Sequence, residues 1–329
     1  MSYESINYLP ENTSKAKVLR LIDLLGYKKG AKIDPSVFAS YTWYENSRET
    51  ISYVGIELSV LKDEDGLFQI YTRTRAGRSF WDLEKQNETI RLLRSYLGGY
   101  FQTDEGINRY FPKEDEPSKL QAALFLPRWK YENEMTMFKM FISTRGMKQE
   151  GITKDALTGI GFIDALNTRF FSNELLIPYF VAIWENYLRS SYVMILRHAN
   201  IKELKRLKKH FQNEELRMLV DGKISFEEAY ANTLSFQRPE AVSENFKALD
   251  SRLDLGGVLK KPFRKRKRNL YSSISEYVDF RNEVVHSGTQ GRNLTDAKIQ
   301  TIAADFTYAV DKIYEEYERC YGLELSRDF

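Results

Sequence analysis

Cysteine and long apolar runs are nearly absent from this chain. Cys320 is the single cysteine among its 329 residues. A lone cysteine excludes an intramolecular disulfide and a multi-cysteine zinc site, and it is typical of the reducing cytoplasm. The most apolar segment, residues 175–184, is followed at once by Glu185 and is too short to cross a bilayer, and residues 1–15 are polar. We therefore expect a cytoplasmic protein without a secretion leader or a membrane span.

Motifs for common cofactors are also missing. The chain has no GxxxxGK[ST] phosphate loop. Gly159 and Gly161 have the spacing of a dinucleotide loop, but no apolar strand precedes them and Asp164 stands where the third small residue belongs. Asp63 and Asp65 begin a calcium-loop pattern that no correctly spaced ligands complete. We expect neither a cofactor nor a metal ion.

The first half of the chain mixes helical and strand periods. Helical spacing appears over residues 14–25, 79–99 and 118–143. Alternating residues 52–61 and 67–75 are joined by the turn-forming sequence KDEDG, a hairpin pattern. We predict an α+β domain with a small antiparallel sheet over residues 1–150.

The second half, residues 151–329, has only helical patterns. A long helix is expected over residues 176–198, and Ser225 with Glu228 forms a capping box for a later one. The clearest helix runs from 296 to 321, with one apolar stripe made of Ile299, Ile302, Phe306, Val310, Ile313, Tyr317 and Cys320. Such a stripe is typical of a core helix, so we predict an all-α bundle.

Positive charge is concentrated in one short stretch. The sequence KKPFRKRKR, residues 260–268, contributes seven cations, whereas the net charge of the whole chain is +3. They are Lys260, Lys261, Arg264, Lys265, Arg266, Lys267 and Arg268. A solvated loop or a nuclear-import sequence has this composition, and so does a loop that binds RNA phosphates with salt-dependent affinity. We predict that these residues bind RNA.

The helix just before the last one carries an arginine where its apolar stripe should continue. In EYVDFRNEVVHSG, residues 276–288, the stripe counted from Ile274 runs through Val278 and Val285, and Arg281 lies between them. Asn282 and His286 are four residues apart and share a face. His286 lies in the last turn, where the helix dipole favours a cationic imidazole that can exchange a proton. An arginine fork matches phosphate oxygens.

This pattern resembles that of the HEPN superfamily of ribonucleases. Their motif is an arginine, usually followed by a polar residue, and then a histidine after four to six intervening residues. Here Arg281, Asn282 and His286 follow that order, with four residues between the arginine and the histidine, in the penultimate helix. The likeness covers about residues 172–325, so the bundle is expected to be HEPN-like.

The resemblance implies a metal-independent endoribonuclease of the toxin or antiviral-defence type. The 2′-hydroxyl of the RNA would attack the adjacent phosphate and leave 2′,3′-cyclic phosphate and 5′-hydroxyl ends. Arg281 would stabilise the phosphate, His286 would move the proton and Asn282 would position both. Because one histidine hardly serves as base and acid together, and such domains typically pair, we expect a homodimer with a composite cleft.

Other interpretations stay open at this point. Arg281 forms a structural ion pair with Glu185 in one of them, while His286 merely caps the helix. In the catalytic interpretation Glu185 instead orients Arg281. A non-catalytic HEPN-like module that binds RNA or protein is the alternative function. The N-terminal domain is expected to act as a sensor or to bind a regulatory or trigger partner.

Overall fold

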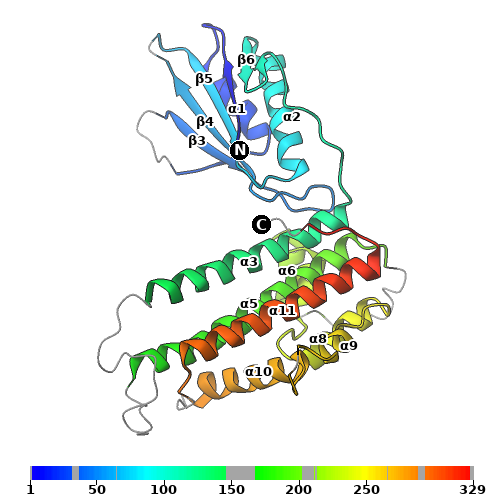
Figure 1. Ribbon diagram of the computed structural model, residues 1–329. Coiled ribbons are helices and arrows are strands. Elements are labelled where there is room, and N and C mark those ends of the chain that lie inside the picture. The colour runs from blue at the N-terminus through cyan, green and yellow to red at the C-terminus, as the bar shows by residue number, and fades with distance from the viewer. Residues whose placement is uncertain are drawn as a thin grey trace. The chain divides into compact units, whose positions relative to one another are not determined.

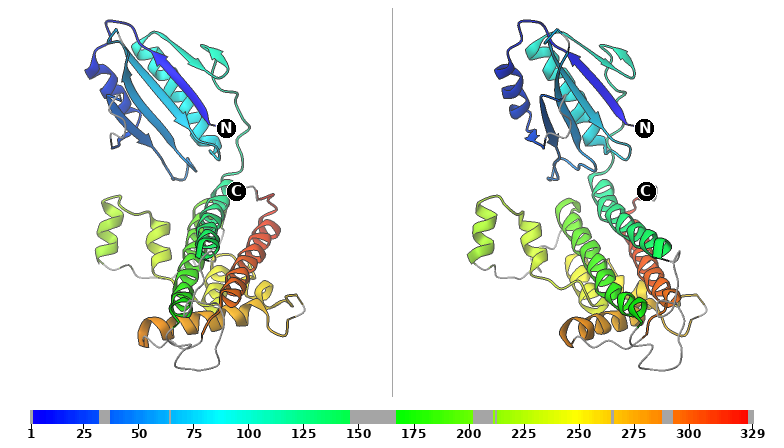
Figure 2. Two further views of the ribbon diagram at one scale, coloured as in Figure 1. Left: turned by 60° about the vertical axis from the view of Figure 1, so that its left-hand side comes forward. Right: turned by 90° about the vertical axis from the view of Figure 1, so that its left-hand side faces the viewer.

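The computed structural model describes residues 2–31, 37–63, 65–145, 167–201, 211, 213–264, 266–287 and 293–326. They form two compact units, Met1–Ala122 and Ala123–Phe329 (Figures 1 and 2). The first unit contains an antiparallel sheet with helices, and the second is helical, so the predicted α+β and all-α order is confirmed.

The boundary between the units lies earlier than the predicted position at residue 150. Helix α3, Lys119–Arg145, continues from the first unit and packs over most of its length within the helical unit. Arg128 forms an ion pair with Asp311 at 2.7 Å, and the Phe138 ring meets the Phe180 ring at a centroid distance of 4.7 Å. These contacts place α3 with the bundle. The sequence STRGMKQEGITKDALTGIG, residues 143–161, is typical of a loop and set the predicted boundary. From residue 146 on it lies outside the described residues.

The sheet of the first unit has the strand order β2-β3-β4-β5-β1-β6-β7, with antiparallel neighbours. Its strands are β1 Tyr3–Tyr8, β2 Lys28–Lys29, β3 Ala39–Trp43, β4 Ile56–Lys62, β5 Phe68–Thr74, β6 Tyr100–Thr103 and β7 Gly106–Ile107. The predicted hairpin is the β4–β5 pair, in which Val60 lies opposite Ile70.

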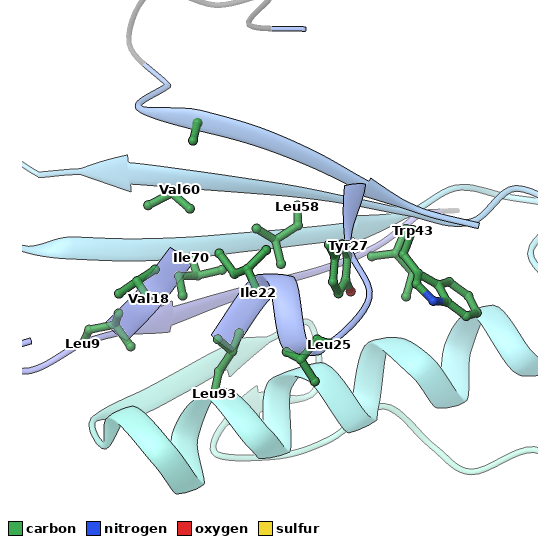
Figure 3. Close-up of a cluster of buried hydrophobic side chains, with 12 residues drawn as sticks. Leu9, Val18, Ile22, Leu25, Tyr27, Trp43, Leu58, Val60, Ile70 and Leu93 are labelled. Atoms are coloured by element: carbon green, nitrogen blue, oxygen red, sulfur yellow. The ribbon is translucent and has the colours of Figure 1, made fainter. Parts of the chain in front are cut away.

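Helices α1, Lys15–Leu24, and α2, Phe80–Leu97, cover one face of this sheet (Figure 3). The sequence offers Asn12, Thr13 and Ser14 as caps for α1, and in the structure Ser14 is the cap, with its side chain accepting the Lys17 N–H. Val18 and Ile22 of α1 pack with Leu93 of α2 against Leu58, Val60 and Ile70 of the sheet. Apolar side chains of period two and period 3.6 therefore meet in one layer, which explains the α+β packing.

A buried carboxylate anchors the chain before β4. Asp82, in the capping box of α2, accepts hydrogen bonds from the backbone N–H groups of Tyr53 at 3.1 Å and of Val54 and Gly55 at 3.2 Å. Because these N–H groups bond to Asp82, they do not pair with a neighbouring strand. The strand predicted from residue 52 therefore begins at Ile56. Gly55 has a φ of +71°, and a Cβ there would lie 2.3 Å from the carbonyl oxygen of Trp43, so only glycine fits.

The helical unit is built on three long helices. Its elements after α3 are α5 Thr168–His198, α6 Asn213–Val220, α7 Phe226–Asn232, α8 Pro239–Leu249, α9 Leu255–Lys260, α10 Leu270–Ser287 and α11 Asp296–Tyr321. Helix α5 begins earlier than predicted because Asn167 caps it. The capping box at Ser225 is confirmed. The sequence also predicts a basic helix with Leu204 and Leu207 after α5, but residues 202–210 lie outside the described residues.

Phe306 of α11 is a centre of the bundle core. It is fully buried, and its ring contacts Phe180 and Trp184 of α5 and Tyr277 of α10, with centroid distances of 6.2, 5.9 and 5.7 Å. The predicted stripe of α11 is buried except at Cys320, which is half-buried because the helix ends there beside Gly322. In the part of the chain that the structure describes, no helix is long and apolar enough to cross a membrane.

Replacing Asp82 by alanine should destabilise the first unit. The change leaves several buried N–H groups without an acceptor, at about 1–3 kcal/mol for each, so we expect a loss of about 3 kcal/mol or more in the free energy of unfolding. Urea unfolding measures the loss in free energy. Hydrogen exchange locates it, because the amides of residues 52–61 should exchange faster in the variant. The matched control is Asp104→Ala, at an exposed turn. Equal effects of the two substitutions would contradict the anchoring role.

Candidate active site at the end of helix α10

Helix α10 presents two buried faces and one exposed face. It is capped by Asn269, whose side-chain oxygen accepts the Ser272 N–H at 2.9 Å. Tyr277, Phe280 and Val284 are buried. The prediction for Val285 is wrong: this side chain is 51% exposed, and Val284 is buried at 8% instead. The reason is that the face through Tyr277 and Phe280 stays covered to the last turn, whereas the stripe through Val278 is covered only as far as the half-buried Arg281.

The structure brings Arg281 and Asn282 into direct contact. Nη1 of Arg281 donates a hydrogen bond of 3.0 Å to Oδ1 of Asn282. Both side chains are half-buried, and His286 is exposed in the last turn. The positions of Arg281 and His286 are separated by about 140° around the helix axis. Their Cβ atoms therefore do not point the same way. The hydrogen bond draws the guanidinium towards Asn282, which shares its face with His286. The guanidinium of Arg281 therefore lies against Asn282, and His286 follows one helical turn later on the same face as Asn282.

A buried ionic cluster lies where α3 ends and α5 and α11 begin. Asp296 accepts from Arg145 at 2.6 Å, from Nε of Arg169 at 3.1 Å and from Asn173 at 2.9 Å. The Asp296 side chain is 10% exposed and that of Arg169 is 5% exposed. Burial alone would raise the pKa of Asp296, but the hydrogen bonds from Arg169, Asn173 and Arg145 lower it below its ordinary value. The carboxylate is therefore held in its charged form.

The same cluster fixes the chain that follows α10. Asn173 donates to the carbonyl oxygen of Leu294 at 2.7 Å. Glu174, which is 2% exposed, accepts the N–H of Asn293 at 2.9 Å. The start of α5 thus holds the backbone a few residues after His286. The start of α11 is therefore anchored to the start of α5.

Glu185 lies on α5 but has other partners. Its Oε1 pairs with Arg189 at 2.5 Å, and its Oε2 accepts from Gln237 at 3.0 Å. Arg281 has its hydrogen bond to Asn282 instead. Neither the ion pair with Arg281 nor the orienting role expected for Glu185 is among the contacts of the described residues.

The basic stretch folds back onto the bundle. The Lys260 ammonium lies 4.6 Å from the Tyr271 ring centroid, Arg264 contacts the Tyr308 hydroxyl, Arg266 pairs with Asp305 at 2.6 Å and Arg268 pairs with Glu276. Lys261 and Lys267 are exposed, and Lys265 lies outside the described residues. The stretch is therefore only in part the freely solvated loop that its composition suggests.

Sequence reasoning missed the cluster around Asp296. Arg145 lies beyond the helix predicted over residues 118–143, and Arg169 precedes the helix predicted over residues 176–198. Neither arginine therefore had an assigned position in the predicted fold. Asp296 was identified only as the start of a helix. Its position after Thr295, the cap of α11, was visible, but its ion-pair partners are far away in sequence. Among the described residues, no group of three or more His, Cys, Asp or Glu side chains is arranged to hold a metal ion.

No protein-family model, curated protein or solved structure matches the chain. A function for it is therefore inferred from its own residues and their geometry. The residues whose chemistry suggests a function are the Arg281–Asn282 pair, the exposed His286 one turn after Asn282, and the basic residues near the start of α10.

Replacing Asp296 by asparagine should destabilise the helical unit by about 3–5 kcal/mol, because it leaves the buried Arg169 and the half-buried Arg145 without their carboxylate. The pKa of Asp296 is lower in the folded protein, so its stabilising contribution is complete above the unfolded pKa of about 3.9. It is lost as the pH falls through the lowered folded pKa. Denaturant unfolding at a series of pH values should show the difference between wild type and Asp296→Asn narrowing in acid. Asp279→Asn, at an exposed pair with Arg238, is the control. A difference that does not change with pH would contradict the prediction.

Proposed function

We propose that the protein is a HEPN-type endoribonuclease that cleaves RNA without a metal ion. The observation that carries the proposal is the hydrogen bond from Arg281 to Asn282, which draws a guanidinium towards the exposed face of His286. Guanidinium groups bind phosphate oxygens, and a histidine transfers protons near neutral pH. The basic residues from 260 to 268, on the segment that leads into α10, add attraction for RNA.

The proposed reaction is an internal transfer within the RNA. The 2′-oxygen forms a bond to the adjacent phosphorus, the bond from phosphorus to the 5′-oxygen breaks, and the products have 2′,3′-cyclic phosphate and 5′-hydroxyl ends. His286 accepts the 2′-hydroxyl proton as general base, and a second acid supplies the proton for the leaving 5′-oxygen. Arg281 stabilises the negative charge of the pentacoordinate phosphorus, and Asn282 positions Arg281.

A second copy of the chain provides the missing acid in this proposal. One imidazole that has accepted the 2′-hydroxyl proton does not also deliver a proton to the opposite side of the phosphorus in the same step. A homodimer with its two α10 ends facing one cleft provides His286 twice, once as base and once as acid. The 51% exposed Val285, between Asn282 and His286, offers apolar surface at that end for contact between subunits.

The α+β unit is proposed to restrain this activity. An unrestrained cytoplasmic ribonuclease harms its own cell, so a toxin or antiviral-defence enzyme needs a trigger. The outer face of the sheet offers a candidate surface, where Arg73 pairs with Glu4 at 3.3 Å and both side chains stay about two-fifths exposed, at 41% and 42%. A regulatory partner that binds this unit would release the activity of the bundle.

Arg281→Ala and His286→Ala should each lower RNA cleavage by at least about a hundredfold, because each removes a group that acts in the transition state. The assay follows a labelled RNA in the presence of EDTA and identifies the cyclic phosphate at the new ends. Arg281→Lys keeps the charge but loses the fork, so most activity should still be lost.

Arg238→Ala is the matched control. This exposed arginine, the cap of α8, pairs with Asp279 of α10 but does not belong to the motif. It should cleave as wild type does. Full activity of His286→Ala, or loss of cleavage in EDTA alone, would refute the proposed mechanism. RNA binding without any cleavage would favour the alternative of a non-catalytic HEPN-like module.

Mixing wild-type chains with an excess of His286→Ala chains should suppress cleavage. Each mixed dimer would hold one histidine where base and acid are both needed, so activity per wild-type chain should fall with the fraction of mixed dimers. Subunits are exchanged before the assay, and sedimentation gives the dimer fraction. Activity that stays proportional to the wild-type chains alone would contradict the composite cleft.

A further inference from the structure

A pocket of about 640 Å³ opens between α10 and α11, beside the end of the basic stretch. The two helices that bound it can be followed in Figure 1. Phe280, Leu294 and Ile302 line it and are at most 7% exposed. Pockets of about 300–1,000 Å³ with an apolar lining and a few placed polar groups are typical ligand sites.

The polar wall of this pocket is held in place by one buried carboxylate. Asp305, with a side chain 1% exposed, pairs with Arg266 at 2.6 Å and accepts from the Tyr277 hydroxyl at 2.9 Å. Arg268 at the rim pairs with Glu276. The two acidic side chains of the lining are thus each matched by an arginine.

Lys298 gives the pocket its remaining positive charge. It is exposed on the first turn of α11, and the pocket lining includes it. Glu276 and Asp305 are balanced by Arg268 and Arg266, so the lining carries a net positive charge through Lys298. An apolar floor with a single excess cation at its rim suits a flat aromatic base that carries one phosphate.

We propose that this pocket binds one unpaired nucleotide of the RNA strand. The base enters against Phe280 and Ile302, and its phosphate lies at the rim beside Lys298 and Arg268. The proposal rests on the proposed ribonuclease function, because it takes RNA as the substrate. A paired base cannot enter, so the pocket selects single-stranded segments. Phe280, which lines the pocket, directly precedes Arg281. The bound nucleotide and the phosphate to be cut therefore both contact the same turn of α10.

The test uses the full-length chain with His286→Ala, so that bound RNA stays intact. Lys298→Glu and Thr301→Trp are added separately, the first to reverse the rim charge and the second to fill the pocket. Glutamate at position 298 completes a capping box with Thr295, the cap of α11, so the helix should remain stable. The probe is a short fluorescently labelled single-stranded RNA of mixed sequence, titrated at several salt concentrations.

Lys298→Glu should weaken binding about tenfold and lower the slope of log affinity against log salt by about one. Thr301→Trp should also weaken it about tenfold, because stacking contributes about 1–3 kcal/mol for each base. Lys247→Glu, an exposed charge reversal on α8, is the matched control and should bind as the parent does. Circular dichroism checks that all variants keep their helices.

RNA affinity that is equal in all three variants overturns the pocket proposal. It is also wrong if mixed nucleoside 5′-monophosphates bind in the pocket while Thr301→Trp leaves RNA affinity intact, since the site then serves a free nucleotide. Cleavage is measured in parallel with Lys298→Glu and Thr301→Trp in chains that keep His286. If the pocket variants lose RNA affinity but the wild-type chain never cleaves RNA, the pocket proposal stands and the proposed ribonuclease function is wrong. If both pocket variants cleave RNA with the rate and KM of the wild type, the proposed ribonuclease function stands and the pocket proposal is wrong.

Discussion

The hydrogen bond from Arg281 to Asn282 is the interaction on which the proposed chemistry depends. Arg281 interrupts the apolar stripe of α10 and starts on a half-buried face, whereas His286 is exposed at the last turn. Without the half-buried Asn282 as partner, nothing in this hydrogen-bond pattern would direct the guanidinium towards the side of the helix on which His286 lies. The 3.0 Å contact with Asn282 restrains it there. The guanidinium is thereby held on the side of the helix that Asn282 shares with His286, one turn further on.

The rest of the bundle fixes where that helix end lies. Phe306 packs α10 and α5 onto α11 through Tyr277, Phe180 and Trp184. Beyond the motif, Asn173 and Glu174 hold the backbone that leads into α11, and Asp296 ties the starts of α5 and α11 together. Apolar packing therefore sets the middle of α10, and buried polar contacts set the chain beyond its end. This division agrees with the cost of burying charges that are not paired.

Local patterns predicted the elements well, and long-range polar contacts escaped them. The stripe of α11, the β4–β5 hairpin and the capping box at Ser225 depend on neighbours in sequence, so they could be predicted. The capping box at Ser79 is equally local, but it was not predicted. The start of β4 was misplaced because Asp82 is distant in sequence from the backbone it binds. The domain boundary was misplaced because the tertiary packing of α3 has no local pattern. For the site, the sequence supplied the motif residues but not the partners of Glu185.

A single altered sugar in the RNA tests the central claim most directly. An RNA that the wild-type chain cuts at one position is remade with a 2′-deoxynucleotide on the 5′ side of that bond. Because the proposed nucleophile is the 2′-hydroxyl itself, the account predicts that this bond stays intact while unmodified RNA is cut to a 2′,3′-cyclic phosphate. Cleavage of the deoxy-substituted bond, or 5′-phosphate ends on the products, would contradict the roles proposed for Arg281 and His286.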